Sequence, residues 1–182
     1  MTRVLIDTCV LYPSILRNVL LGCAKVRLFE PLWSEHIFEE WRRAAVRNGI
    51  AFEAGIEIAL VRANWRNSII SVPEALKNGL VLPDEDDRHV LAAAIEGKAG
   101  ELLTLNTRDF PTRILGKHDV IRRHPDEFLM ELALANSNLV KGVIDGVCAV
   151  AKKGKGERFN RRKTLQRAGI PRVAKWDSAL TS

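Results

Sequence analysis

The sequence predicts an α/β protein in which helices flank a parallel β-sheet and an all-helical C-terminal extension follows. Up to about residue 124, short apolar runs alternate with segments of helical periodicity, which is the order typical of parallel sheets. After His124-Pro125 the strand-like runs stop and only helical patterns follow. We therefore expect a sheet-containing domain over residues 1–124 and a helical extension over residues 125–182.

Strands are predicted where a brief apolar run is bounded by polar or turn residues, and helices where apolar residues recur every three to four positions. The predicted strands are 3–6, 26–29, 69–72, 101–105 and a short one near 119–121. The helices predicted between them are 13–24, 34–48, 53–66 and 85–97. In the extension, the predicted helices are 125–136, 138–152 and 159–168.

Helix boundaries follow from residues with capping or stopping chemistry. Ser34 is a natural N-cap, because its hydroxyl can accept a bond from the first helical turn. Pro125 suits a first helical position. Gly169 suits a helix end, and Pro171 reinforces that stop.

Acidic or amide residues follow two of the predicted strands. Asp7 ends the run Val4-Leu5-Ile6, and Asn106 and Asp109 follow the strand that ends at Leu105. In open α/β sheets the carboxyl ends of strands form the ligand-binding edge. The alternatives are structural: Asp7 could cap the following helix, and Asn106 or Asp109 could form an Asx turn.

Two further acidic positions lie on predicted helices. Glu40 borders the apolar stripe that contains Ile37 and Trp41, where a carboxylate needs a partner; an ion pair with Arg43 is the alternative to a ligand. Asp84 and Asp87 are three residues apart and can face the same side. A helix-capping role would explain Asp84, but Asp87 lies on the side that carries the apolar residues.

Together, these acids indicate a site for a hard divalent metal. Carboxylates about 5 Å apart repel each other by roughly 3 kcal/mol per pair at an effective dielectric near 20, so a cluster favours a cation. Oxygen ligands without a His/Cys cluster favour Mg²⁺ or Mn²⁺ over Zn²⁺. Cys9, Cys23 and Cys148 have no metal or redox spacing, and His89 is interpreted as a helix-surface or packing residue. The chain is thus a candidate metal-dependent phosphodiesterase.

Four motifs in order resemble the PIN domain family over roughly residues 1–124. They are Val-Leu-Ile-Asp-Thr-Cys-Val-Leu; Ser34 with Glu40 six residues later; Pro-Asp-Glu-Asp-Asp-Arg-His-Val-Leu-Ala-Ala-Ala-Ile; and Leu-Thr-Leu-Asn-Thr-Arg-Asp-Phe-Pro. The resemblance implies a parallel sheet flanked by helices and a Mg²⁺ or Mn²⁺ site. It carries over Asp7, Glu40, Asp87 and Asp109 as the catalytic, metal-binding acids, with Asp84 and Asn106 as further metal ligands.

Many PIN members are VapC-type toxins of bacterial toxin–antitoxin pairs that cut RNA. The resemblance therefore implies a metal-dependent endoribonuclease, an antitoxin partner and a homodimer. Two alternatives stay open: a non-catalytic RNA-binding PIN protein, and a nuclease that acts on DNA. A phosphohydrolase with an Asp nucleophile usually needs a second acid two residues after the first, and Cys9 stands there.

The positive charge is concentrated in the extension. Residues 141–182 hold 11 Lys and Arg against three Asp and Glu, whereas the whole chain has a net charge of +6. Basic segments beside an acidic metal site suit a nucleic-acid backbone, so Lys152, Lys153, Arg161 and Arg162 are candidate RNA-binding residues. The alternative is a solvated basic tail.

Compartment expectations follow from apolar runs and cysteine usage. Asp7 interrupts the first apolar run, which argues against a signal peptide, and no run reaches about 18 apolar residues, so no membrane segment is expected. Three cysteines without a pairing pattern favour a reducing cytoplasm.

Overall fold

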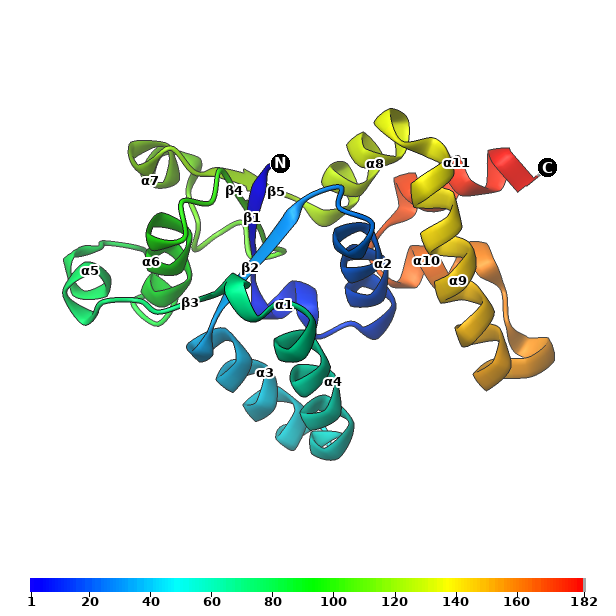
Figure 1. The fold of residues 1–182 in the computed structure, drawn as a ribbon, viewed down its shortest axis with the longest axis horizontal. Coiled ribbons are helices and arrows are strands. Elements are labelled where there is room, and N and C mark those ends of the chain that lie inside the picture. The colour runs from blue at the N-terminus through cyan, green and yellow to red at the C-terminus, as the bar shows by residue number, and fades with distance from the viewer. Residues whose placement is uncertain (182) are drawn as a thin grey trace. The chain divides into compact units, whose positions relative to one another are not determined.

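The computed structural model describes residues 1–181, which form two compact units (Figure 1). The first unit combines Met1–Tyr12 with Phe29–Arg123. The second combines Pro13–Leu28 with the chain from His124 onward. The chain therefore leaves the first unit after twelve residues, returns to it, and leaves it again near the predicted boundary at residue 124.

A five-stranded parallel sheet forms the first unit, as the sequence predicts. Its strand order is β3-β2-β1-β4-β5. The strands are β1 (Arg3–Ile6), β2 (Glu30–Ser34), β3 (Ile69–Ile70), β4 (Glu101–Leu103) and β5 (Ile121–Arg123). The central strand β1 places Leu5 opposite Leu32 of β2 and Leu102 of β4. All three leucines are fully buried, which is expected for a strand covered on both faces.

Helices of the first unit connect and flank these strands. They are α1 (Thr8–Leu11), α3 (Glu35–Arg47), α4 (Ala51–Asn64), α5 (Glu74–Gly79), α6 (Arg88–Glu96) and α7 (Thr112–Leu115), with 3₁₀ turns at Arg66–Ser68 and Gly116–His118. The helices α3 and α4 pack side by side (Figure 1). The Ser34 hydroxyl accepts a bond from Ile37 N and caps α3, as predicted.

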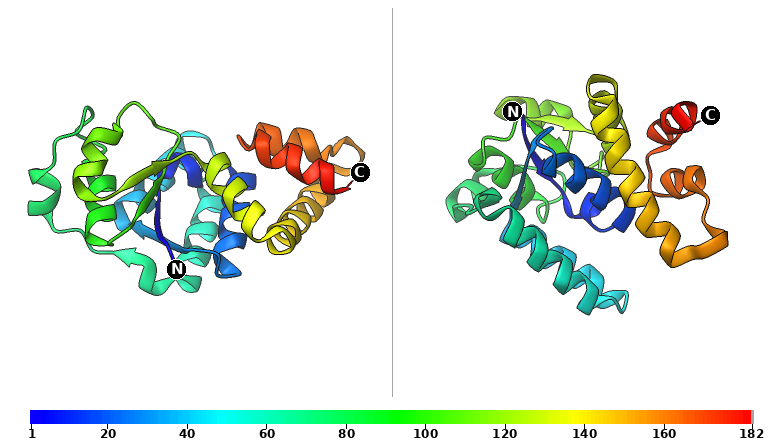
Figure 2. Two further views of the ribbon diagram at one scale, coloured as in Figure 1. Left: turned by 90° about the horizontal axis from the view of Figure 1, so that it is seen from above. Right: turned by 45° about the vertical axis from the view of Figure 1, so that its right-hand side comes forward.

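The second unit is all-helical. It contains α2 (Ser14–Lys25), α8 (Pro125–Ala135), α9 (Ser137–Lys155), a 3₁₀ turn at Gly156–Arg158, α10 (Arg161–Arg167) and α11 (Pro171–Thr181). In Figure 2 the yellow to red ribbons are α8 to α11. The helix α2 packs on α9, where a Cβ on Gly22 would lie 2.5 Å from Val143 Cγ1. The buried Asp126 joins α8 to α11 by accepting bonds from the backbone N–H groups of Arg172 and Val173.

Some predicted elements were wrong or missing. The strand predicted at 26–29 is instead a turn, in which Arg27 has a left-handed φ of 61°, and the strand starts at Glu30. Pro31 lies inside that strand, and proline normally argues against a central strand. The predicted helix stop at Gly169 and Pro171 is confirmed, because α10 ends at Arg167; the helix α11, which begins at Pro171, was not predicted. The short helix α5 was also not predicted.

None of the described helices combines the length and apolar character that crossing a bilayer requires.

Candidate metal centre and active site

The carboxyl edge of the sheet carries the candidate site. Asp7 follows β1, Asn106 follows the adjacent strand β4, and Glu40 lies on α3 directly after β2. Asp87 precedes α6. These four side chains line one pocket of about 530 Å³. The pocket is also lined by Thr8, Cys9, Tyr12, Arg43, Ala44 and Arg47.

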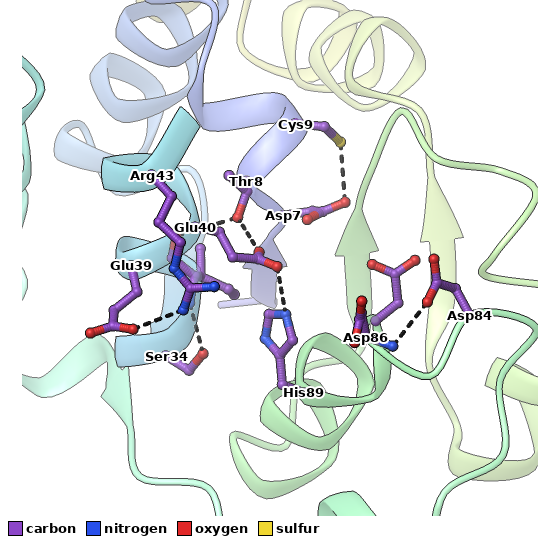
Figure 3. A network of polar contacts seen from close by, with 12 residues as sticks. Asp7, Thr8, Cys9, Ser34, Glu39, Glu40, Arg43, Asp84, Asp86 and His89 are labelled. Carbon is purple, nitrogen blue, oxygen red and sulfur yellow. Dashed lines mark hydrogen bonds and ion pairs between the residues drawn. The ribbon is translucent and has the colours of Figure 1, made fainter. Parts of the chain in front are cut away.

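Asp7 is held in place by hydrogen bonds from two neighbours. Its side chain is buried, and its Oδ2 accepts bonds from Thr104 Oγ1 (2.6 Å) and Cys9 Sγ (3.1 Å; Figure 3). Burial raises the pKa of the Asp7 carboxyl, and the charge of Glu40 adds to this, although the two hydrogen bonds oppose it. Asp7 makes no side-chain capping bond to α1, so the alternative of a simple helix cap was wrong.

Both carboxylate oxygens of Glu40 have a partner. Thr8 Oγ1 donates to Oε2 (2.7 Å), and His89 Nε2 lies 3.1 Å from Oε1 (Figure 3). Burial alone would raise the pKa of Glu40, but His89 and Thr8 outweigh it and leave the pKa below its ordinary value. Because the carboxylate is ionised, His89 Nε2 must be the donor. The alternative pairing with Arg43 is not observed, since Arg43 binds Glu39 instead (3.0 Å).

His89 has a role that the sequence reading missed. It was expected at the helix surface or as a packing residue, but its side chain is only 3% exposed and its polar edge contacts Glu40. Its ring stacks on His36 with a centroid separation of 3.9 Å. One sequence feature could have indicated that His89 is buried. It directly precedes Val90 and Leu91, on a helix whose apolar face is buried.

Asp87 also belongs to a second group of acidic side chains, with Asp84 and Asp109. Carboxylate oxygens of Asp84, Asp87 and Asp109 lie within 4.8 Å of one another. Asn106 connects them, because its Nδ2 donates to Asp87 Oδ2 (3.1 Å) and its Oδ1 accepts from Asp109 N (3.3 Å). Asp84 accepts a bond from Asp86 N (2.9 Å), so it forms a local turn rather than a cap on α6.

Asp87 has the most crowded electrostatic environment of these acids. Partial burial raises its pKa to about 6, and the surrounding charges add to this effect. Those charges are on Asp7, Asp84, Asp109 and Glu40. Asp87 is at the N-cap position of α6 but makes no side-chain capping bond. Within the described residues Asp87 forms no ion pair, and repulsion among several carboxylates is what a site for a divalent cation would show.

Three residues that support the acids were also not singled out by sequence reasoning. Thr8 donates a hydrogen bond to Glu40, and Cys9 and Thr104 donate to Asp7. Burial and the charge of Asp7 raise the pKa of the Cys9 thiol to about 12, so it stays protonated and donates. Thr104 Oγ1 in turn accepts from Asn106 N (2.9 Å), which links the loops after β1 and β4.

The candidate RNA-binding residues lie in the second unit and differ from one another. Lys152, Lys153 and Arg162 are exposed. Arg161 instead binds Asp177 and Asp145, each at 2.6 Å, and Asp177 is fully buried. Its guanidinium therefore joins helices within the protein, contrary to the expectation that it faces a nucleic acid.

The comparisons with known proteins agree with this geometry. The profile of the PIN domain family matches residues 3–108, which is more than half of the chain. The chain belongs to the PIN domain family. All the candidate acids except Asp109 lie inside the matched range, and Asp109 follows it directly.

A relative of this PIN protein is the "Putative ribonuclease VapC50" of Mycobacterium tuberculosis (strain ATCC 25618 / H37Rv). It is 30% identical over an alignment of 93 residues that covers 46% of this chain. The match spans 55% of the relative's length, so about half of that protein has a counterpart here. No solved structure matches the chain significantly.

Proposed function

We propose that this PIN protein is a Mg²⁺- or Mn²⁺-dependent endoribonuclease, and the toxin of a type II toxin–antitoxin pair. The observation that carries the proposal is the convergence of Asp7, Glu40 and Asp87 in one pocket, with Asp84, Asn106 and Asp109 beside Asp87. Its ribonuclease aspect is supported by the similarity to a relative named as a ribonuclease.

The donor set fits a hard divalent ion. Asp7, Asp87 and Asp109 offer carboxylate oxygens, and Asp84, Glu40 and the Asn106 carbonyl can complete or support the set. When bound, such an ion stabilises negative charge on the phosphate and lowers the pKa of a water. The raised pKa of Asp87 supports this assignment, because nearby positive charge would relieve the repulsion that raises it.

The chain's own residues orient the reacting groups. Thr104 and Cys9 fix the Asp7 carboxylate, while Thr8 and His89 fix that of Glu40. Glu40 keeps a lowered pKa and stays ionised, so it can accept a proton from an attacking water. Water then adds to phosphorus, the bond to the leaving oxygen breaks, and that oxygen takes up a proton.

Purified protein with total RNA and Mg²⁺ or Mn²⁺ tests the proposal. Asp7→Asn should abolish cleavage without unfolding the protein, because it removes a charge from a repulsive cluster as well as a ligand. Glu40→Gln should also lower cleavage strongly, whereas Glu39→Gln, one residue away in an exposed pair, is the matched control and should cleave normally. Cleavage that survives EDTA, or Asp7→Asn at the wild-type rate, would refute the metal mechanism.

The toxin role and the partners need their own experiment. We expect a small protein encoded by the adjacent reading frame to bind this chain and inhibit its cleavage of RNA, and we expect the free protein to be a homodimer. Co-purification, inhibition assays and light scattering measure these properties. A duplex DNA of matched sequence separates ribonuclease from deoxyribonuclease activity, and preferential cutting of DNA would replace the proposed substrate.

A further inference from the structure

A cationic pocket lies in the second unit, where the 3₁₀ turn after α9 leads into α10. Its volume is about 590 Å³. It is lined by Gly154, Arg158, Asn160, Lys163, Thr164 and Arg167. Among the described residues, no acidic side chain contributes to this lining, so three cationic groups surround the space without a built-in counter-ion.

Two of the three acids within residues 141–182 are engaged in ion pairs outside the pocket lining. Asp177 binds Arg161, and Asp145 binds Arg161 and Lys141. Glu157 is the third acid within residues 141–182 and is exposed. Within residues 1–181, Arg158, Lys163 and Arg167 form no ion pair, and all three are exposed. Because Arg161 binds both Asp145 and Asp177, these two acids do not neutralise the cationic side chains of the pocket.

The polar lining of the pocket suits phosphate oxygens. Asn160 Oδ1 caps α10 by accepting from Lys163 N (2.9 Å), which leaves its amide NH₂ group as a donor. Two guanidinium groups and an ammonium are the side chains that recognise phosphate best. The lining contains no aromatic or large apolar residue, so the pocket offers neither a stacking platform for bases nor an anchor for a protein segment.

We propose that this pocket binds the phosphate backbone of single-stranded RNA, with little preference for base sequence. The inference rests on the proposed ribonuclease function and adds a binding site outside the acidic centre. Arg167 also borders a second pocket of about 230 Å³ beside Pro13 and Ser14, so one guanidinium can serve adjoining phosphates. The exposed Lys152, Lys153 and Arg162 extend the positive surface on the same helices.

The experiment measures binding of a fluorescent single-stranded RNA of mixed sequence, in EDTA, over a range of NaCl concentrations. The triple variant R158Q/K163Q/R167Q should lower the slope of log K against log salt by about 2, because each lost phosphate contact contributes about 0.7. At physiological salt its affinity should fall at least about tenfold. These side chains are exposed, so the fold should persist, and thermal unfolding checks this.

Two matched variants make the result specific. K25Q/R113Q/K117Q removes the same charge from exposed sites outside the pocket and should change the slope much less. R158K/R167K keeps the charge and should keep most of the slope. The proposal is overturned if the pocket variant behaves like the remote variant, or if it loses binding to an acidic protein partner while its RNA slope is unchanged.

Cleavage by the wild-type protein with Mg²⁺ or Mn²⁺ is measured separately. If the wild type cleaves RNA but the triple variant keeps the wild-type salt slope, the proposed RNA-binding role of the pocket is refuted and the proposed function stands. If the triple variant shows the lower salt slope but the wild type does not cleave RNA, the nuclease proposal is refuted and RNA binding by the pocket stands.

Discussion

Single residues in the acidic centre are positioned by neighbours that do not themselves carry the chemistry. His89 is the clearest case, because it is almost fully buried and its Nε2 contacts Glu40. Groups that orient a metal-binding carboxylate typically contribute 10–100-fold to metal affinity or activity.

His89→Ala should reduce cleavage by about 10–100-fold, because Glu40 loses the donor that fixes one of its oxygens. Excess Mn²⁺ should restore part of the rate if the loss comes from Glu40 orientation. His36→Ala removes the stacked neighbour without removing a hydrogen bond to Glu40 and is the control. An unchanged metal requirement in His89→Ala, measured by Mn²⁺ titration of the rate, would show that the histidine only packs.

Asp87 should make the metal-free protein less stable as pH rises. Its pKa is about 6 in the folded state and near 3.8 when unperturbed, so between these values the folded protein binds more protons than the unfolded chain. The contribution of Asp87 to the free energy of unfolding therefore decreases as pH rises from about 4 to about 6 and stays low above that. Urea unfolding in EDTA at a series of pH values measures this pH dependence of the free energy of unfolding.

Asp87→Asn should not show the decrease in stability between about pH 4 and about pH 6. Without metal it should be more stable than the wild type at neutral pH. Saturating Mg²⁺ should stabilise the wild type more at pH 7.5 than at pH 5, because protons compete with the ion. A wild-type stability that does not differ from Asp87→Asn in its pH dependence would contradict the raised pKa.

Within the second unit, the helices α2 and α9 approach each other closely at a glycine. Gly22 on α2 faces Val143 on α9, and an added Cβ would lie 2.5 Å from its Cγ1. Gly142, the residue before Val143 in α9, has open space where an added Cβ would lie. The same substitution should thus have opposite effects at two neighbouring places.

Gly22→Ala should destabilise the protein by about 1–3 kcal/mol, because Val143 or the helix α2 must shift. Gly142→Ala should stabilise it by about 0.5–1 kcal/mol, since alanine is the better helix former and nothing obstructs its methyl group. Chemical denaturation of both variants tests this. Gly22→Ala/Val143→Ala should recover part of the loss, and a lack of recovery would place the strain elsewhere.

The sequence predicted most helices and strands, and the errors in these predictions have physical causes. Apolar runs and Ser34 located β1, β4 and α3 correctly, because local patterning and capping determine them. The start of β2 was missed because Pro31 lies in a central strand, a context that local propensity disfavours. The meeting of Asp7 with Thr104, and of Glu40 with His89, depends on strand order and helix docking, which residue spacing does not specify.

For the whole molecule, the two units differ in chemistry as well as in fold. The first carries the sheet and the acidic centre, and the second carries most of the uncompensated positive charge. The chain passes between them three times, near residues 12, 28 and 123. The second unit is consequently built from two separate stretches of sequence.

This interleaving means that the sheet-containing unit is not a detachable module. A fragment that stops at residue 124 would keep α2 but lose α8 to α11, so the face of α2 around Gly22 would be left bare. We expect such a fragment to aggregate or bind hydrophobic dyes in expression trials, where the full chain does not. Gene fusions or transplants that treat the last sixty or so residues as an optional appendage would therefore disrupt the protein near its beginning.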